Sequence, residues 1–149
     1  EPLGAWDPDG YRDLRAKTST LIGYGEREWE PAGYGRILQT GTVDVVGVDP
    51  GRVGGISGFR RIAEMVHTHG RQVNAHAWSS AITTAASLAL SLNSPAAKLF
   101  EMKPLRNPMQ HELVDRPFAD QDGYMYPPAG VGLGVNVRGD VVEKYRYDG

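Results

Sequence analysis

Five side chains that can carry charge or exchange protons recur along the sequence at nearly constant intervals. Glu1, Glu26, Asp49, His76 and Glu101 are separated by 25, 23, 27 and 25 residues. Carboxylates can bind a cation or hydrogen-bond a substrate, and an imidazole beside a carboxylate can act as a general base near neutral pH. A random scatter of acidic residues would not keep this interval. The spacing therefore indicates that a repeated structural unit carries these residues.

The last four of these residues stand at or just after the end of a short apolar, β-branched or aromatic run. The runs cover residues 21–25, 43–48, 72–75 and 98–100. Together with the segments between them, they give the alternation of strand, loop and helix that is typical of parallel α/β folds. Such folds place their active sites at the carboxyl ends of the strands.

The local sequence predicts the elements in more detail. Strands are expected over 20–25, 43–48, 72–76 and 98–102, and helices over 7–17, 31–39, 57–69 and 80–92. Asp7 and Pro8 suit the start of the first helix, and Gly41 and Gly70 end the second and third. From Lys103 the periodicity fails, and many prolines and glycines predict an irregular tail that packs over another part of the protein. Residues 135–147 alternate weakly, which predicts one or two edge strands.

Units of this length make the sheet parallel, with right-handed crossovers. Two architectures satisfy that pattern. A doubly wound open sheet would be complete in 149 residues, whereas an eight-stranded barrel needs roughly 250. Spacing alone does not choose between them.

Composition narrows the class of protein. The chain has 149 residues, 40% of them hydrophobic, and a net charge of −2, as expected for a globular protein with one core and no basic excess for nucleic acid. The lack of cysteine excludes disulfides and thiolate metal sites and fits a cytoplasmic location. No apolar run is long enough to span a membrane, and the first residues do not form a signal peptide. Because the sequence starts at Glu1 rather than at methionine, we expect it to be part of a longer protein.

The motifs around the spaced residues resemble those of one family. Asp49-Pro50-Gly51-Arg52-Val53-Gly54-Gly55 resembles the Asp-x-x-Lys/Arg-x-Gly-Gly signature of the enolase superfamily, in its mandelate racemase-like subgroup. The resemblance continues, in the expected order, with Gly25-Glu26, His76-Ala77-Trp78, Phe100-Glu101, Asp122-Gly123, Pro128 and Gly132-Leu133-Gly134. Each piece is weak alone, but together they cover nearly the whole chain.

This resemblance implies an α/β fold, the C-terminal part of a (β/α)7β barrel similar to a TIM barrel. Residues 1–102 would form the second half of the barrel, from the end of strand four to strand eight. Residues 103–149 would be a C-terminal tail that packs towards an N-terminal capping domain. That domain and the first barrel strands would belong to another part of the same protein, which is therefore the first partner we expect, because half a barrel exposes two unpaired sheet edges.

The same resemblance implies a role for each site residue. Glu26 is the last of three carboxylates that hold Mg²⁺, and Asp49 orients His76, which takes or returns the proton α to a substrate carboxylate. Glu101 hydrogen-bonds that carboxylate or its enediolate, so His76 and Glu101 both bind substrate. Glu1 directly precedes a proline and aligns with the second acid of the family's Glu-Glu/Gln-Pro motif, so we do not count it as a ligand.

Simpler interpretations compete for each residue. Glu26 would be a solvated acid, His76 a hydrogen-bonded core histidine and Asp49 the cap of the next loop. Glu101 would pair with one of the nearby cations Lys98, Lys103 and Arg106. The other histidines, at positions 67, 69 and 111, are expected on the surface, and Trp29 and Trp78 either wall the pocket or belong to the core. Gly54-Gly55 lacks the spacing of a phosphate-binding loop and is explained by the turn into a helix.

The implied activity is Mg²⁺-dependent abstraction of an α-proton through an enediolate. Our first hypothesis is a lyase, a dehydratase that converts a sugar acid into a 2-keto-3-deoxy acid. The alternatives are an isomerase, acting as racemase or epimerase of a 2-hydroxy acid, and a non-catalytic half-barrel fragment. A lysine pair that supplies the second base in racemases of the subgroup would lie outside this chain. Members are commonly dimers or octamers, which implies a homo-oligomer.

Overall fold

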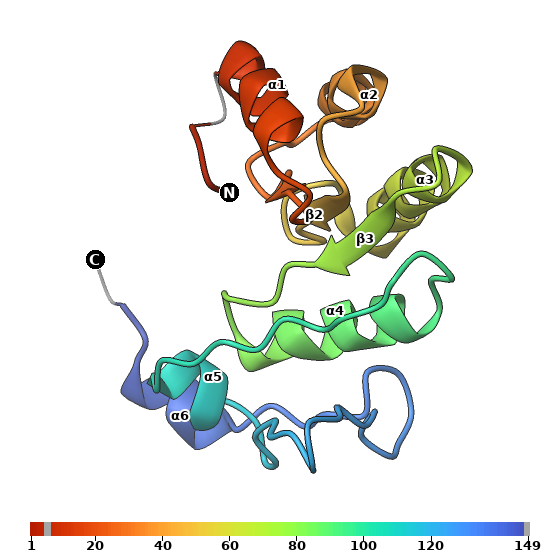
Figure 1. Ribbon diagram of the computed structural model, residues 1–149. Coiled ribbons are helices and arrows are strands. Elements are labelled where there is room, and N and C mark those ends of the chain that lie inside the picture. The colour runs from red at the N-terminus through yellow and green to blue at the C-terminus, as the bar shows by residue number, and fades with distance from the viewer. Residues whose placement is uncertain (5–6, 148–149) are drawn as a thin grey trace.

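A computed structural model describes residues 1–4 and 7–147, and three parallel strands lie at its centre. The strands β1 (Gly23–Tyr24), β2 (Val45–Val48) and β3 (Gln72–Ala75) follow one another in the order β1-β2-β3. The two crossovers contain the helices α2 (Pro31–Thr40) and α3 (Gly55–Thr68), while α1 (Pro8–Lys17) precedes β1 and α4 (Ala81–Leu92) follows β3. Figure 1 shows these four helices fanned in an arc around one side of the strands. The alternation predicted from the sequence is thus confirmed.

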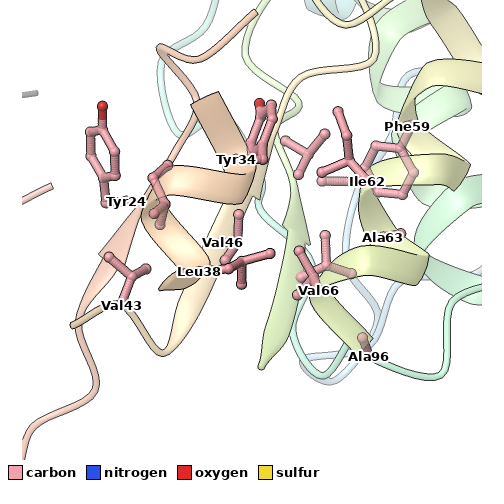
Figure 2. Packing of buried hydrophobic residues seen from close by; sticks show 14 of the residues in the cluster. Tyr24, Tyr34, Leu38, Val43, Val46, Phe59, Ile62, Ala63, Val66 and Ala96 are labelled. Atoms are coloured by element: carbon pink, nitrogen blue, oxygen red, sulfur yellow. The ribbon is translucent and has the colours of Figure 1, made fainter. Parts of the chain in front are cut away.

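Hydrophobic packing lies between the strands and this arc of helices. In β2 and β3 every second residue is buried, for example Val46 and Val73, and these side chains meet buried residues of α2 and α3 such as Tyr34 and Phe59 (Figure 2). The intervening strand residues are only partly buried. Parallel sheets are normally covered on both faces. The described part of the chain therefore covers one face of its sheet and leaves the other open.

The helix ends follow the signals in the sequence. The side chain of Asp7 accepts a hydrogen bond from Gly10 N at 2.8 Å, and that of Ser80 accepts from Thr83 N at 3.3 Å. Gly41 ends α2 in the left-handed conformation, with φ of 66°. These capping groups satisfy backbone groups that a helix end leaves unpaired. The four predicted helices are confirmed to within about two residues of their ends, the usual uncertainty of helix boundaries.

Two predictions about the strands are corrected. The strand expected over 98–102 is not formed, because the chain pairs with β3 only through a parallel bridge between Val73 and Ala97 and then leaves the sheet. Leu99 is 78% exposed, so the apolar run finds no second neighbour to pack against. The strand β1 is also shorter than the predicted 20–25, since it pairs only with β2.

The tail from Lys103 is mostly irregular, as predicted, but of its predicted edge strands only an isolated antiparallel bridge between Val114 and Val137 forms. Residues 139–144 form the short helix α6 (Gly139–Lys144), with Asp140 in its first turn and Lys144 in its last, a charge order that favours a helix. Earlier in the tail, a helical turn, α5 (Pro108–His111), places Gln110 against α4, where its Nε2 donates to Thr84 Oγ1 at 2.8 Å. Figure 1 shows the tail running along α4. Residues 148–149 of the predicted tail lie outside the described residues.

In the part of the chain that the structure describes, no helix combines the length and apolarity needed to cross a membrane.

Candidate active site

The sheet brings the predicted site residues to one edge. Asp49 directly follows β2, His76 directly follows β3, and Glu26 comes two residues after β1. Since the strands are parallel and in register, with Val48 opposite Ala75, their carboxyl ends lie side by side. The backbone N–H of His76 donates to Val48 O at 2.9 Å and so extends the pairing to the site.

Two glycines allow the first two strand ends to approach closely. Gly25 has φ of +137°, and a Cβ atom added there would lie 2.7 Å from the carbonyl oxygen of Gly47. A Cβ atom on Gly47 would lie 3.2 Å from Glu26 N. Any larger residue would push the strands apart. The Gly-Glu pair therefore places Glu26 directly against the end of β2, next to the loop that carries Asp49.

Asp49 and His76 form a buried pair. Nδ1 of His76 lies 2.8 Å from Oδ2 of Asp49, while Oδ1 of Asp49 accepts from Gly51 N at 2.7 Å. The two residues are 4% and 7% exposed. Asp49 thus caps the following loop and holds the imidazole at the same time, so the two interpretations of this residue are compatible. The pair fixes the ring and leaves its other nitrogen, Nε2, for chemistry.

The electrostatics of the pair favour a charged imidazole. The hydrogen bond to Asp49 raises the pKa of His76, burial opposes the rise, and the charges of Glu26 and Glu101 add to it. Burial pushes the pKa of Asp49 upward, but the hydrogen bonds from His76 and Gly51 outweigh it, and the pKa lies below its ordinary value. His76 is therefore a stronger base than a free imidazole, and Asp49 stays ionised.

Nε2 of His76 points to a cluster of carboxylates. It lies 3.5 Å from Oε2 of Glu26, and one ligand atom each from Glu26, His76 and Glu101 lie within 4.8 Å of one another. Burial raises the pKa of Glu101, which the charge of His76 and a hydrogen bond from Ala77 N at 3.3 Å oppose. The structure therefore gathers all four predicted site residues, two of them from loops more than 70 residues apart in the sequence.

The donor set suits a hard divalent cation. Two carboxylates converge, and a cavity of about 140 Å³ beside them is lined by Glu26, Glu101, Gly47 and Asn74 among others. Oδ1 of Asn74 is buried there without a hydrogen-bond partner, so the cavity offers a further oxygen that requires one. Mg²⁺ prefers oxygen ligands, which makes the carboxylates the suitable ligands and leaves the imidazole for proton transfer.

Other residues singled out from the sequence lie around this cluster. Glu1 accepts a hydrogen bond from Gly25 N at 3.4 Å and pairs with Arg27 at 2.9 Å, and it lines the same cavity without joining the cluster of Glu26, His76 and Glu101. In the described residues Glu101 forms no ion pair with a lysine or arginine, and Lys103 instead donates to the carbonyl oxygen of Trp78 at 3.0 Å. The pairing expected as an alternative for Glu101 is thus wrong.

The structure agrees with some of the predictions for the two tryptophans and the other histidines and not with others. Trp29 and Trp78 are 64% and 38% exposed, so neither belongs to the core. His67 and His69 are exposed as expected, whereas His111 is half-buried and its Nδ1 lies 3.0 Å from Asn107 O. His111 is therefore only partly exposed, so the expected surface position is met in part.

Sequence reasoning gave Arg52 no role beyond its place in the signature motif. In the structure its guanidinium touches the loops of both Glu26 and Asp49. The only signal in the sequence is the position three residues after Asp49, which one turn of backbone brings back towards the carboxylate.

Fold and site together define a class: a parallel α/β domain with a histidine–aspartate pair facing two carboxylates at the carboxyl ends of its strands. The chain belongs to the family described as enolase C-terminal domain-like, whose sequence profile matches residues 1–141. Within the enolase superfamily its relatives are of the mandelate racemase-like kind, so the resemblance inferred from the motifs and the predicted fold class are confirmed.

Relatives of known name agree with this assignment. The chain is 30% identical to D-gluconate dehydratase of Thermoproteus tenax, over 99% of the chain and 30% of the relative. It is 25% identical to D-galactarolactone cycloisomerase of Agrobacterium fabrum, over 98% of the chain and 41% of the relative. A crystal structure from Bordetella bronchiseptica RB50, described as a candidate mandelate racemase, matches 100% of the chain and 40% of its own length, with a TM-score of 0.93 and 30% identity. The chain thus spans between about a third and two fifths of these proteins.

Proposed function

We propose that the protein containing this chain removes the proton α to the carboxylate of a sugar acid and then eliminates water, which yields a 2-keto-3-deoxy acid. The observation that carries this proposal is the position of His76, whose Nδ1 is held by Asp49 while Nε2 faces Glu26 and Glu101. Relatives named as D-gluconate, D-xylonate and D-galactonate dehydratases support the choice of sugar acids. They support an enzyme of the lyase class.

Each residue has a part in this reaction. Glu26 would hold Mg²⁺, which when bound supplies positive charge that makes the α-proton of a carboxylate substrate more acidic. Nε2 of His76 takes that proton as the C–H bond breaks, and the electron pair passes into the substrate carboxylate to give an enediolate. The electron pair then returns to form the Cα–Cβ double bond as the C–O bond to the β-hydroxyl breaks, and the hydroxyl leaves as water with the proton that Nε2 of His76 had taken. The resulting enol tautomerises to the ketone.

Asp49 and Glu101 support these steps without exchanging the α-proton themselves. Asp49 fixes the ring of His76 and stabilises its protonated form through the hydrogen bond at Nδ1. Glu101 would hydrogen-bond the substrate carboxylate or the enediolate. The raised pKa of Glu101 makes its protonated form, which can donate such a bond, easier to reach.

The remaining parts of the enzyme would come from outside this chain. Residues 1–102 would be the second half of a barrel, and the open face of the sheet would meet the first half. Residues 103–149 would pack on a capping domain, which the exposed Tyr124, Tyr126 and Val131 of the tail support. The other metal ligands and a second base would also lie in the missing part, and the assembly would be a homo-oligomer.

An isomerase is the second candidate. A relative is named as a cycloisomerase, and a racemase or epimerase would use the same α-proton abstraction at His76. The two reactions would differ in their second step, because an isomerase returns a proton to the opposite face of the carbanion instead of expelling the β-hydroxyl. That step needs a second base on the opposite face of the substrate, which would come from outside this chain.

The test is an assay of the full-length protein against a library of sugar acids, with and without Mg²⁺. Formation of 2-keto-3-deoxy acids and exchange of the α-proton in D₂O are scored in parallel. Keto acid that depends on Mg²⁺ would establish a dehydratase, whereas exchange without keto acid would establish a racemase or epimerase. If neither signal is seen with any acid, the proposal is refuted and a non-catalytic protein is favoured.

A further inference from the structure

Arg52 lies between the two loops that carry the site residues from β1 and β2. Its Nη1 donates a hydrogen bond to the backbone carbonyl oxygen of Glu26, and its Nε lies 3.4 Å from Oδ2 of Asp49. The guanidinium carbon also lies 5.9 Å from the centre of the Trp29 ring. One side chain therefore contacts the loop of the proposed metal ligand, the carboxylate of the buried pair and an aromatic wall.

The oxygen that Arg52 approaches is the one that holds His76. Oδ2 of Asp49 accepts from Nδ1 of His76 at 2.8 Å and faces Nε of Arg52 at 3.4 Å. A turn of this carboxylate away from Arg52 would therefore also turn the imidazole. The same guanidinium of Arg52 also binds the backbone carbonyl oxygen of Glu26. The distance between Glu26 and His76 therefore depends on the position of this guanidinium.

The surroundings distinguish this contact from an ordinary surface ion pair. The side chain of Asp49 is 6% exposed and that of Arg52 is 32% exposed, with the guanidinium over the ring of Trp29. By contrast, Arg27 is 66% exposed where it pairs with Glu1, a setting in which ion pairs contribute little. Arginine presents donors in a rigid plane, so Nε and Nη1 can serve two acceptors at once, which the single ammonium of lysine does not reproduce.

We propose that Arg52 is a positioning residue that sets the distance between Glu26 and the Asp49–His76 pair. This inference rests on the proposed function for the roles of Glu26 and His76. Arg52 acts through these residues and does not touch substrate. Groups that orient metal ligands and catalytic bases in this way typically contribute about 10–100-fold to metal affinity or activity.

The test compares Arg52→Ala and Arg52→Lys with the control Arg60→Ala in the full-length protein. Arg60 is an exposed residue of α3 that lines an outer groove with Phe59 and Ser94, away from the site. For each variant we would measure the melting temperature, Mg²⁺ affinity by calorimetry, and kcat and KM on the sugar acid that the library assay identifies. The assays of Arg52→Ala would be repeated with added guanidinium ion below denaturing concentrations.

We expect Arg52→Ala to lose about 10–100-fold in kcat/KM or in Mg²⁺ affinity at an unchanged melting temperature, with partial rescue by guanidinium. Arg52→Lys should show most of the same loss in kcat/KM or Mg²⁺ affinity. Arg60→Ala should match the wild type. If Arg52→Ala fails to fold, the kinetics and Mg²⁺ affinity of Arg52→Lys alone test the proposal. Wild-type kinetics and Mg²⁺ affinity in both Arg52 variants would overturn the proposal, as would a loss that follows the melting temperature and is not rescued.

Failure of the proposed function would look different. In that case the wild type turns over no sugar acid, whereas the Mg²⁺ affinities of Arg52→Ala and Arg60→Ala can still be compared. Equal affinities would then overturn the role of Arg52, and a weaker affinity in Arg52→Ala alone would support it.

Discussion

The two ends of strand β2 each carry an aspartate, and their surroundings differ. Asp44 precedes the strand and binds two guanidinium groups: Arg15 on one oxygen and Arg71, at 3.1 Å, on the other. It also accepts from Ile22 N at 2.9 Å. Asp49 follows the strand and faces one imidazole, one guanidinium and one backbone N–H.

The aspartate at one end of β2 therefore has partners suited to stability, and the aspartate at the other end has partners suited to proton transfer. Arginine stays protonated at any physiological pH, so the carboxylate of Asp44 is held by groups that do not exchange protons. The carboxylate of Asp49 is held against a histidine, whose charge changes near neutral pH. In parallel α/β barrels the amino ends of strands serve stability and the carboxyl ends serve catalysis. Asp44 at the amino end and Asp49 at the carboxyl end follow this rule, although they are only five positions apart in the sequence.

The largest effect expected at the carboxyl end is that of His76→Asn. Without the imidazole there is no base at Nε2, so turnover should fall by about 100–10,000-fold. Mg²⁺ binding and the melting temperature should stay close to the wild type, because Glu26 and the core are unchanged. Steady-state kinetics and calorimetry check both statements. Retained activity would remove His76 from the mechanism.

Asp49→Asn should keep the fold but weaken the base. The hydrogen bond to Asp49 is the main cause of the raised pKa of His76. Below that pKa the base is protonated and inactive, so the acid limb of the wild-type kcat/KM profile should lie above the ordinary imidazole pKa of about 6.5. In Asp49→Asn the limb should move to lower pH, and kcat should fall by at least about 100-fold, the lower range of acid–base contributions. An acid limb at the wild-type position would contradict this account of the pair.

Asp44→Asn should give the opposite result, a loss of stability with little change in kcat. Two partly buried guanidinium groups lose their counter-charge, so the free energy of unfolding should fall by about 1–3 kcal/mol. Urea unfolding of the full-length protein measures this change. The control Asp9→Asn removes an ion pair with Arg12 in which both side chains are more than half exposed, and it should change stability by less than about 0.5 kcal/mol. A loss of kcat in folded Asp44→Asn would break the division between the two ends.

The smallest effects concern the two carboxylates near Nε2. If Glu26 holds Mg²⁺ and Glu101 binds substrate, Glu26→Gln should weaken Mg²⁺ affinity, whereas Glu101→Ala should raise KM by about tenfold, the value of one charge-assisted hydrogen bond. Calorimetric titration of both variants with Mg²⁺ makes the comparison. An equal loss of Mg²⁺ affinity in both would show that Glu101 is also a ligand.

Much of this arrangement is predictable from local sequence. Capping residues such as Asp7 and Ser80 and the stop at Gly41 mark helix ends through contacts within a few residues, and those predictions are confirmed. The predicted strand over 98–102 is wrong, because a strand needs a partner and Leu99 finds none in the described chain. The weak alternation after residue 135 was also poor evidence for a strand. Burial of Val141 and the charges of Asp140 and Lys144 favour the helix α6 there.

The sequence by itself determined the order of the elements and the interval that places an acid or a histidine after each strand, because these depend on local propensity and spacing. Only the tertiary structure decided which atoms meet. Nδ1 of His76 faces Asp49 and Nε2 faces Glu26 because Gly25 and Gly47 let two strand ends touch. Arg52 joins both loops for the same reason, since contacts between residues 26 positions apart depend on how the strands pair in three dimensions.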